Sequence, residues 1–246
     1  MSAGDTARQG RATRTLRAVV REPGTVTRAV LDGRGTEYLS LGRLLTVCVA
    51  VFFALTWVQQ RRPAVPSPDV AAACDGSGSD TSALGALLGA AGGNVQGASP
   101  AASAALGIAH QLLCDPARFT RAFTLAAPVA FLLLIPLSAW LMQLAFRRQM
   151  PTFAANWTYG LEAHAALFLL LAVLAAIGLL GSSLLGFLAS IAGLVYASWN
   201  VVAGVQRAYG VSRGVAARRT TAVGVVYALA LTAVTSLVMW GLLSRG

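Results

Sequence analysis

Charged residues are scarce in this sequence, and lysine is absent. Of the 246 residues, 11% are charged and 56% are hydrophobic, whereas an ordinary soluble domain has roughly 25% charged residues. This shortage of charge excludes a typical soluble globular domain and predicts an integral membrane protein. All 19 basic residues are arginine, a bias that, together with abundant alanine, glycine and leucine, is typical of a GC-rich bacterial genome.

Histidine and cysteine are also few, with two and three residues. No C-x-x-C or H-E-x-x-H spacing occurs, so there is no zinc signature, and neither a metal nor a cofactor is expected. The net charge of +10 would suit a nucleic-acid partner. However, the arginines have no soluble surface with base-reading or stacking groups beside them. Nucleic acid is therefore not expected as a partner.

Much of the sequence consists of long apolar segments, in which we identify five candidate membrane spans. A membrane-spanning helix needs about 20 mostly apolar residues. The region from His164 to Val205 has no charged residue across 42 positions, and as one helix it would measure about 63 Å, twice the thickness of the hydrocarbon core. It must turn back, and we expect the turn at Gly181 to Ser183. The predicted fold is all-α, a polytopic membrane protein with spans at about 41–58, 123–146, 163–180, 184–205 and 220–243.

The arginines indicate the orientation of these spans, because short basic loops stay in the cytoplasm. In an alternating five-span topology, most of the arginines fall on the side of the N-terminus. We therefore expect the N-terminus in the cytoplasm, the C-terminus in the periplasm and the protein in a bacterial inner membrane. The long segment 59–120 would be a periplasmic insert between the first two spans.

Residues 1–40 are predicted to form a basic cytoplasmic arm. Pro23 and Gly24 would end a first helix, and a second short helix is expected from about Thr25 to Leu31, ending near Gly33. A basic amphipathic helix beside a membrane contacts anionic lipid headgroups. The alternative is a solvated arm that only enforces topology. Four arginines recur at helical spacing and define the basic face of the first helix: Arg11, Arg14, Arg17 and Arg21.

The predicted periplasmic insert contains Cys74 and Cys114, whereas Cys48 lies within the first span. Thiols oxidise in a bacterial periplasm. We therefore predict a disulfide between Cys74 and Cys114, the alternative being two free thiols in a loosely ordered loop.

Small residues form stripes on the last two spans. They let membrane helices approach closely, so both stripes predict helix–helix interfaces, either within one chain, between two copies or with a protein partner. The stripes are Gly186, Ala189, Ser190, Gly193 and Ala197 on the fourth span, and Gly224, Ala228, Thr232 and Ser236 on the fifth.

A candidate polar cluster lies where the third span begins and the fourth ends, at the predicted cytoplasmic side. It consists of Tyr159, Glu162, His164 and Asn200. Glu162 and His164 are two residues apart, about 200° around a helix, so they do not face one ligand. Neither a catalytic triad nor an intramembrane proton pathway is indicated. The plainer interpretation is a polar rim with helix–helix hydrogen bonds.

Three segments of the sequence resemble parts of a known protein family. They are RTLRAVVREPGTVTRAVLDGRGTEYLSLGRLL, YGLEAHAALFLLL, and YASWNVVAGVQRAYGVSRGVAARR before the final span. They are similar to a bacterial family of integral membrane proteins of unknown function, whose members typically have an N-terminal zinc ribbon and a basic arm. This sequence lacks the ribbon, because no cysteine precedes Cys48. The family has no established activity, so the resemblance implies the membrane architecture and little more.

These features favour a non-enzymatic inner-membrane protein, a scaffold or membrane-organising component that contacts anionic lipid or a protein partner. The alternative is a small-solute transporter or channel component, with Pro128 and Pro136 as hinges and Glu162, His164 and Asn200 as a cytoplasmic gate. An intramembrane enzyme using the same group is a third hypothesis. A water-filled cavity shared by the gate residues would favour transport, whereas continuous, well-packed helices would favour a scaffold.

Overall fold

A computed structural model describes residues 3–61, 130 and 133–243 of the chain. Every regular element within those ranges is helical, which confirms the predicted all-α class. One compact unit contains Met1–Gln59 and Pro128–Leu237. The predicted arm therefore belongs to the same unit as the long apolar helices.

Four helices are long and apolar enough to cross a membrane, as expected of a multi-pass membrane protein. They are α3 (Leu41–Gln60), α8 (Phe153–Gly178), α9 (Ser183–Tyr209) and α10 (Arg213–Leu243). The predicted span 123–146 lies partly outside the described residues. Its described part is the apolar helix Leu133–Phe146, which continues through Pro136.

Helix α8 begins ten residues before the predicted start of its span, at Phe153 rather than 163. The Thr152 side chain accepts a hydrogen bond from the amide of Ala155 (3.4 Å) and caps the helix. The polar residues that follow belong to the same helix. Hydropathy underestimates the length of α8 because its first turns are polar.

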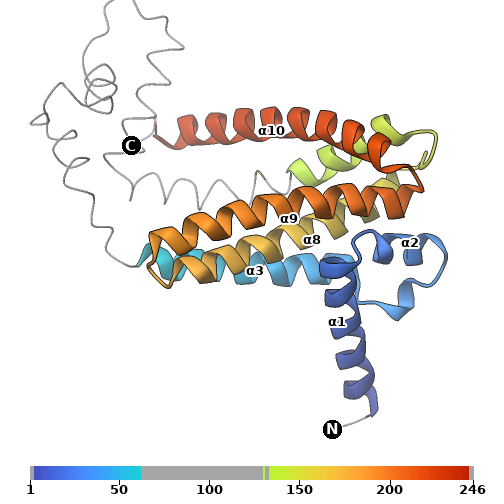
Figure 1. Ribbon diagram of the computed structural model, residues 1–246, viewed down its shortest axis with the longest axis horizontal. Helices are drawn as coiled ribbons and strands as arrows, with labels where there is room; N and C mark the ends of the chain where they lie inside the picture. Colours follow the sequence, from blue (N-terminus) through green and yellow to red (C-terminus); the bar gives the residue numbers. More distant parts are fainter. Residues whose placement is uncertain (1–2, 62–129, 131–132, 244–246) are drawn as a thin grey trace, which may run out of the picture. The chain divides into compact units, whose positions relative to one another are not determined.

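Helices α8 and α9 form the predicted hairpin and lie side by side (Figure 1). Gly181 has a φ of +75°, a left-handed conformation that favours glycine, and Ser182 caps α9. A Cβ atom on Gly193 would stand 3.1 Å from Leu174 of α8, so this part of the α9 stripe packs within the chain. Gly186 and Gly224 have no neighbour within 4 Å of such a position.

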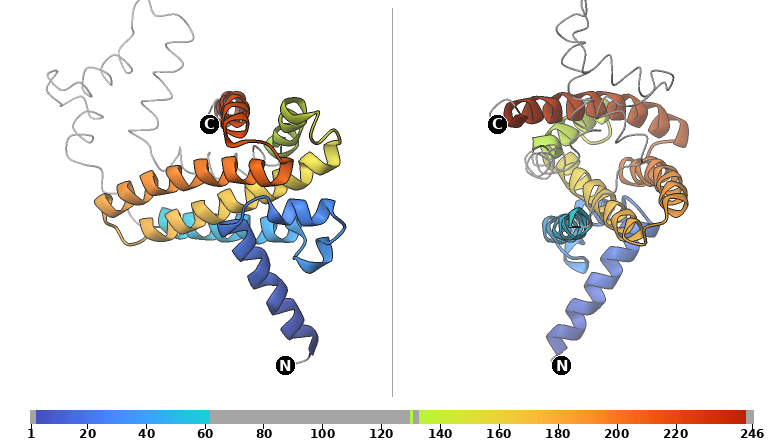
Figure 2. Two further views of the ribbon diagram at one scale, coloured as in Figure 1. Left: turned by 45° about the vertical axis from the view of Figure 1, so that its right-hand side comes forward. Right: turned by 90° about the vertical axis from the view of Figure 1, so that its left-hand side faces the viewer.

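The arm folds as α1 (Ala3–Arg21), α2 (Thr25–Leu31) and a 3-10 turn, η1 (Gly35–Glu37). The predicted bounds of the second helix are confirmed. Gly24 and Gly33 have φ values of +84° and +80°, so the chain turns sharply at both ends of α2. Figures 1 and 2 show α1 running crosswise to α3, α8 and α9, while α2 packs against α8 and α9.

Two apolar clusters hold the unit together. In the first, Val19 of α1 and Val26 of α2 pack with Leu44 of α3 and Phe168 of α8. The second joins the helix Leu133–Phe146 to α8 and α9 through one tilted and one edge-to-face ring contact. The ring centroids of Phe146 and Tyr209 are 4.6 Å apart, and those of Tyr159 and Tyr209 are 5.4 Å apart. The arm is thus part of the hydrophobic core.

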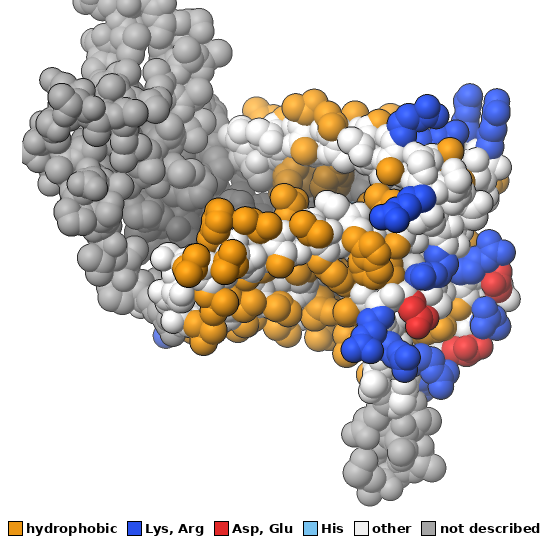
Figure 3. Space-filling view, viewed as in Figure 1, with side chains coloured by type: hydrophobic (Ala, Val, Ile, Leu, Met, Phe, Trp, Pro, Cys, Tyr) orange, Lys and Arg blue, Asp and Glu red, His pale blue; other side chains and the backbone are white. Residues whose placement is uncertain are grey.

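The surface of the unit divides into a charged end and apolar sides. In Figure 3 the arginines and acidic side chains gather at the end that carries α2, and apolar side chains cover the visible sides of the long helices. Large exposed apolar residues include Trp57, Leu184, Phe187, Leu194 and Leu229. Apolar surface of this extent marks a membrane or protein contact.

Two predictions fall outside the described residues. The proposed disulfide partners, Cys74 and Cys114, and nearly all of the insert 59–120 lie in 62–129, so both predictions stay untested. Cys48 lies in α3 as expected, and it is buried and unpaired.

The two turn glycines of the arm make a matched test. Gly24→Ala should destabilise the docked arm by about 2–5 kcal/mol, because a left-handed alanine costs about 1–2 kcal/mol and a steric clash adds about 1–3 kcal/mol. The new Cβ would meet the carbonyl oxygen of Gly204. Gly33→Ala has only the conformational cost, since its Cβ would have no neighbour within 4 Å. Hydrogen exchange of the α2 amides measures the difference, and equal protection in both variants would refute the close contact.

Candidate functional site

Glu162 holds the start of α2. Its carboxylate is 2% exposed and accepts hydrogen bonds from the Gly24 amide (2.8 Å), the Thr27 amide (2.7 Å) and the Thr27 hydroxyl (2.6 Å). The first amides of a helix have no partner within the helix, and the residue that precedes α2, Gly24, has no side chain to accept them. Glu162 therefore caps α2 from a distance, where the positive end of the helix dipole favours a carboxylate.

Helix α9 binds the other side of the corner between α1 and α2. Asn200 Nδ2 donates to the Val19 carbonyl (3.1 Å), and the Tyr196 hydroxyl donates to the Val20 carbonyl (2.9 Å). These carbonyls lie in the last turn of α1, where no helical amide follows to bond them. An acceptor on α8 thus satisfies the amides that begin α2, and donors on α9 satisfy the carbonyls that end α1.

Arg207 adds a cationic contact at the same corner. One of its guanidinium nitrogens, Nη1, donates to the carbonyl of Pro23 (2.6 Å). Glu162 accepts hydrogen bonds from residues between Val19 and Thr27, and the side chains of Asn200, Tyr196 and Arg207 donate to carbonyls in the same stretch. This short stretch is the docking point of the arm.

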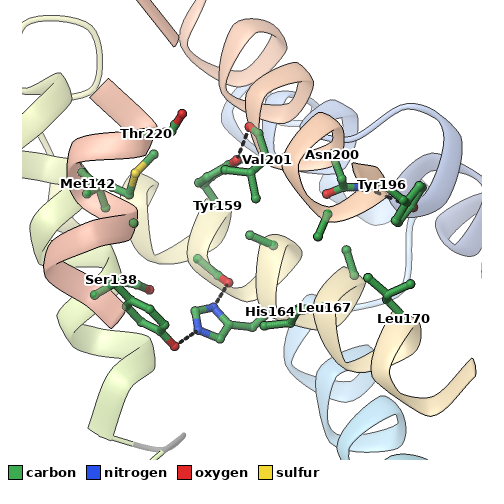
Figure 4. Close-up of a pocket in the computed structure, with 17 residues that line it drawn as sticks. Ser138, Met142, Tyr159, His164, Leu167, Leu170, Tyr196, Asn200, Val201 and Thr220 are labelled. Atoms are coloured by element: carbon green, nitrogen blue, oxygen red, sulfur yellow. Dashed lines mark hydrogen bonds between the residues drawn. The ribbon is translucent and has the colours of Figure 1, made fainter. Parts of the chain in front are cut away.

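His164 faces away from the arm and toward α10. Its Nδ1 lies 2.7 Å from the Gly160 carbonyl, and its Nε2 lies 2.9 Å from the Tyr227 hydroxyl (Figure 4). A carbonyl oxygen only accepts, so Nδ1 carries the hydrogen of the neutral ring and Nε2 accepts from Tyr227. The pair joins α8 to α10. Glu162 and His164 point to different helices, as their spacing predicts.

Three of the four predicted cluster residues line one cavity, and the fourth does not. Tyr159, His164 and Asn200 border a cavity of about 180 Å³ between α8, α9, α10 and the helix Leu133–Phe146 (Figure 4). Glu162 is absent from its lining. The predicted gate of Glu162, His164 and Asn200 is therefore not a single group around one space.

The polar groups of the cavity are already hydrogen-bonded within the protein. The Tyr159 hydroxyl donates to the Val201 carbonyl (3.1 Å), Ser138 to Ile135 (2.7 Å) and Thr220 to Ala216 (2.7 Å). Among the described residues, no buried side-chain nitrogen or oxygen is left without a partner. These groups serve the fold, and the remaining lining is mostly alanine, valine and leucine.

In the part of the chain that the structure describes, no three His, Cys, Asp or Glu residues are close enough to hold a metal ion. Glu162 and His164, the acidic and basic candidates of the cluster, face opposite sides of α8. The pair therefore has no shared position at which a substrate could react with both.

The predicted lipid-facing arginines lie on the free side of α1. Arg14, Arg17 and Arg21 are exposed, and Arg11 is half-buried. The arginines around α2 differ, because they have acidic neighbours: Arg28 lies 3.3 Å from Asp32, and Arg34 lies within 4 Å of both Asp32 and Glu37. Helix α1 thus presents positive charge that none of these acidic groups offsets.

Sequence reasoning missed the roles of Gly24, Thr27, Tyr196 and Arg207. The sequence contained one signal for a distant cap. Gly24 precedes α2 at the position where a Ser, Thr, Asp or Asn would normally cap the helix, so the acceptor for the first amides had to come from elsewhere. The sequence contains no signal that identifies Glu162 as that acceptor, since 138 positions separate it from Gly24.

No family model, curated protein or solved structure matches this chain. The resemblance to the membrane-protein family with a zinc ribbon therefore stays a prediction.

Loss of the cap should release the arm. Glu162→Ala is expected to destabilise the docked arm by about 2–6 kcal/mol, because two buried amide donors lose their acceptor at about 1–3 kcal/mol each. Thr27→Val removes only the hydroxyl bond and should cost about 1.5–3 kcal/mol. His164→Ala is the control, since His164 faces α10. Hydrogen exchange of α2 reports each change, and unchanged protection in Glu162→Ala would contradict the cap.

The contact between His164 and Tyr227 can be measured by a double-mutant cycle. His164→Ala, Tyr227→Phe and the double variant should give a coupling energy of about 0.6 kcal/mol and no more than about 1.7 kcal/mol, the average and the maximum for hydrogen bonds between membrane helices. Reversible unfolding in mixed micelles provides the free energies. Additive effects of the two substitutions would show that the pair does not stabilise the packing of α8 and α10.

Proposed function

We propose that the protein is a non-enzymatic component of a bacterial inner membrane, a scaffold or membrane-organising protein that contacts anionic lipid headgroups through its arm. The single observation that carries this proposal is the position of α1. It is attached to the charged end of the long helices and runs crosswise to them (Figure 2). If these helices cross a bilayer, α1 lies along the bilayer surface.

The composition of α1 favours electrostatic attraction over insertion. Val19 is buried in the core, and Leu16 is only 39% exposed, so α1 offers little apolar surface to lipid. Its exposed arginines are worth about 1 kcal/mol each beside an anionic membrane. Such contacts weaken with salt, because charges are screened over about 8 Å at physiological ionic strength.

The distribution of charge supports a cytoplasmic position for this end. The arm, the turn after Phe146 and the ends of α9 and α10 beside their connection all contain arginine. They lie together at the charged end (Figure 3). Cytoplasmic loops are enriched in arginine, so the proposal places the N-terminus inside and leaves the exposed small-residue face of α10 for a second copy or a protein partner.

A transporter or channel component is the alternative function. It would need groups that can bind a polar solute along its pathway. The cavity beside His164 and Asn200 is lined mostly by apolar residues, and Glu162 is engaged with the arm. Helices α8 and α9 also run unbroken for 26 and 27 residues, whereas transporter sites commonly form at broken helices. These observations favour the scaffold.

The test compares two pairs of arginines in the full-length protein. We expect Arg14→Ala/Arg17→Ala to lower the preference of the reconstituted protein for phosphatidylglycerol over phosphatidylcholine, by up to about fivefold per arginine at low salt. Spin-labelled lipids of both kinds measure the preference. The matched control is Arg28→Ala/Arg34→Ala, since these two side chains already have acidic partners. Equal losses from both pairs, or no loss from either, would refute a lipid-contacting role for α1.

A further inference from the structure

The cavity beside His164 is an elongated slot that runs along the helices. On α8 it is lined by residues on one face, from Tyr159 to Leu170. On α10 it is lined by one face from Thr220 to Tyr227. Eleven positions along α8 correspond to about 16 Å. The slot is therefore long in the direction of the predicted spans, and α9 and the helix Leu133–Phe146 form its other walls.

The slot has a buried floor and an exposed rim. Tyr159, Ala166 and Thr220 on the floor are buried, whereas Val201 is 37% exposed and Gly224 is exposed. A ligand could therefore enter from the side, between α9 and α10. In a membrane-embedded protein, that side faces lipid.

The slot is built for a hydrocarbon. None of the described residues that line it is charged, and their polar side chains are hydrogen-bonded within the protein. An apolar cavity of about 150 Å³ stays dry and binds benzene, so the volume of about 180 Å³ suits roughly six carbons. The remaining carbons of a longer chain would follow the open side.

The dimensions match one leaflet of a bilayer. Half of a hydrocarbon core is about 15 Å thick, close to the length of the slot along α8. Arg213, seven residues before Thr220, is exposed on the same face of α10 and lies about 10 Å nearer the charged end. A phosphate headgroup would lie at the level of Arg213, with its chain pointing toward Leu170. This charge complementarity selects a phospholipid over an uncharged hydrocarbon.

We propose that the slot binds one acyl chain of a phospholipid from the leaflet next to the charged end. The proposal rests on the membrane location in the proposed function but not on the role of α1. The lipid would fill the space between α9 and α10 and complete the packing of α10, which contacts α8 through the bond between Tyr227 and His164.

Photo-crosslinking tests this proposal in the full-length protein. The probe is phosphatidylglycerol with a diazirine midway along one acyl chain, in phosphatidylcholine vesicles that contain the reconstituted protein. Mass spectrometry should locate adducts on Leu167, Leu170 and Val201, besides those on outward-facing residues such as Phe187.

Two glycines provide matched variants. A Cβ at Gly224 or at Gly186 would meet no atom within 4 Å, but only Gly224 lines the slot. Gly224→Leu should reduce slot adducts by about tenfold, because its side chain displaces a few methylene groups that each contribute to burial. Gly186→Leu should leave them unchanged, and labelling of Phe187 gives the background in every sample.

A second substitution guards against misfolding. Ala197→Leu fills the slot from α9, and hydrogen exchange of α2 shows whether each variant retains the docked arm. Slot adducts that persist in both filled variants would overturn the proposal, because the probe would then be labelling from the outer surface. Absence of slot adducts in the unmodified protein would also overturn the proposal, because the acyl chain would then not enter the slot.

The crosslinking result can be distinguished from the result of the lipid-preference test on α1. Slot labelling together with unchanged lipid preference in Arg14→Ala/Arg17→Ala would support the slot and refute the headgroup role of α1. Release of the protein from membranes by alkaline carbonate would refute both.

Discussion

The carboxylate of Glu162 is the contact on which the charged end of the unit depends. Removing a carboxylate from water costs several kcal/mol unless hydrogen bonds and favourable dipoles replace the lost hydration. Gly24 and Thr27 supply three donors at the positive end of α2. Helix α2 has only seven residues, too few to be stable alone. The buried charge and the short helix therefore require each other, and neither is stable without the other.

This mutual dependence explains why the arm turns where it does. A chain that ends one helix and starts another leaves carbonyls and amides unpaired at the turn, and such groups are costly beside apolar surface. Asn200 and Tyr196 bind the carbonyls while Glu162 binds the amides. Because donors and acceptor come from two neighbouring helices, the turn is held at one place, and α1 leaves the unit crosswise to the spans.

Local sequence signals predicted much of the fold and little of this contact. Length and hydropathy located four long apolar helices, and Gly181 marked the hairpin, because these features depend on neighbouring residues. The start of α8 was wrong by ten residues, since the polar turns before Glu162 resemble a loop to any hydropathy scale. The spacing of Glu162 and His164 correctly predicted that they face apart. It could not predict their partners, because Thr27 and Tyr227 approach only when the helices pack.

The arm and the slot share a segment of α9, and this links the two ends of the proposed lipid contact. Asn200 lines the slot and also binds the arm at Val19. Four residues later, Gly204 lies against Gly24 of the arm and near the hydroxyl of Tyr159, which forms part of the slot. A shift of α9 by a few tenths of an ångström would change both contacts, because packed interiors leave little room for one to move alone. The packing of α9 therefore physically connects the arm, where headgroup contacts are proposed, to the space beside α10.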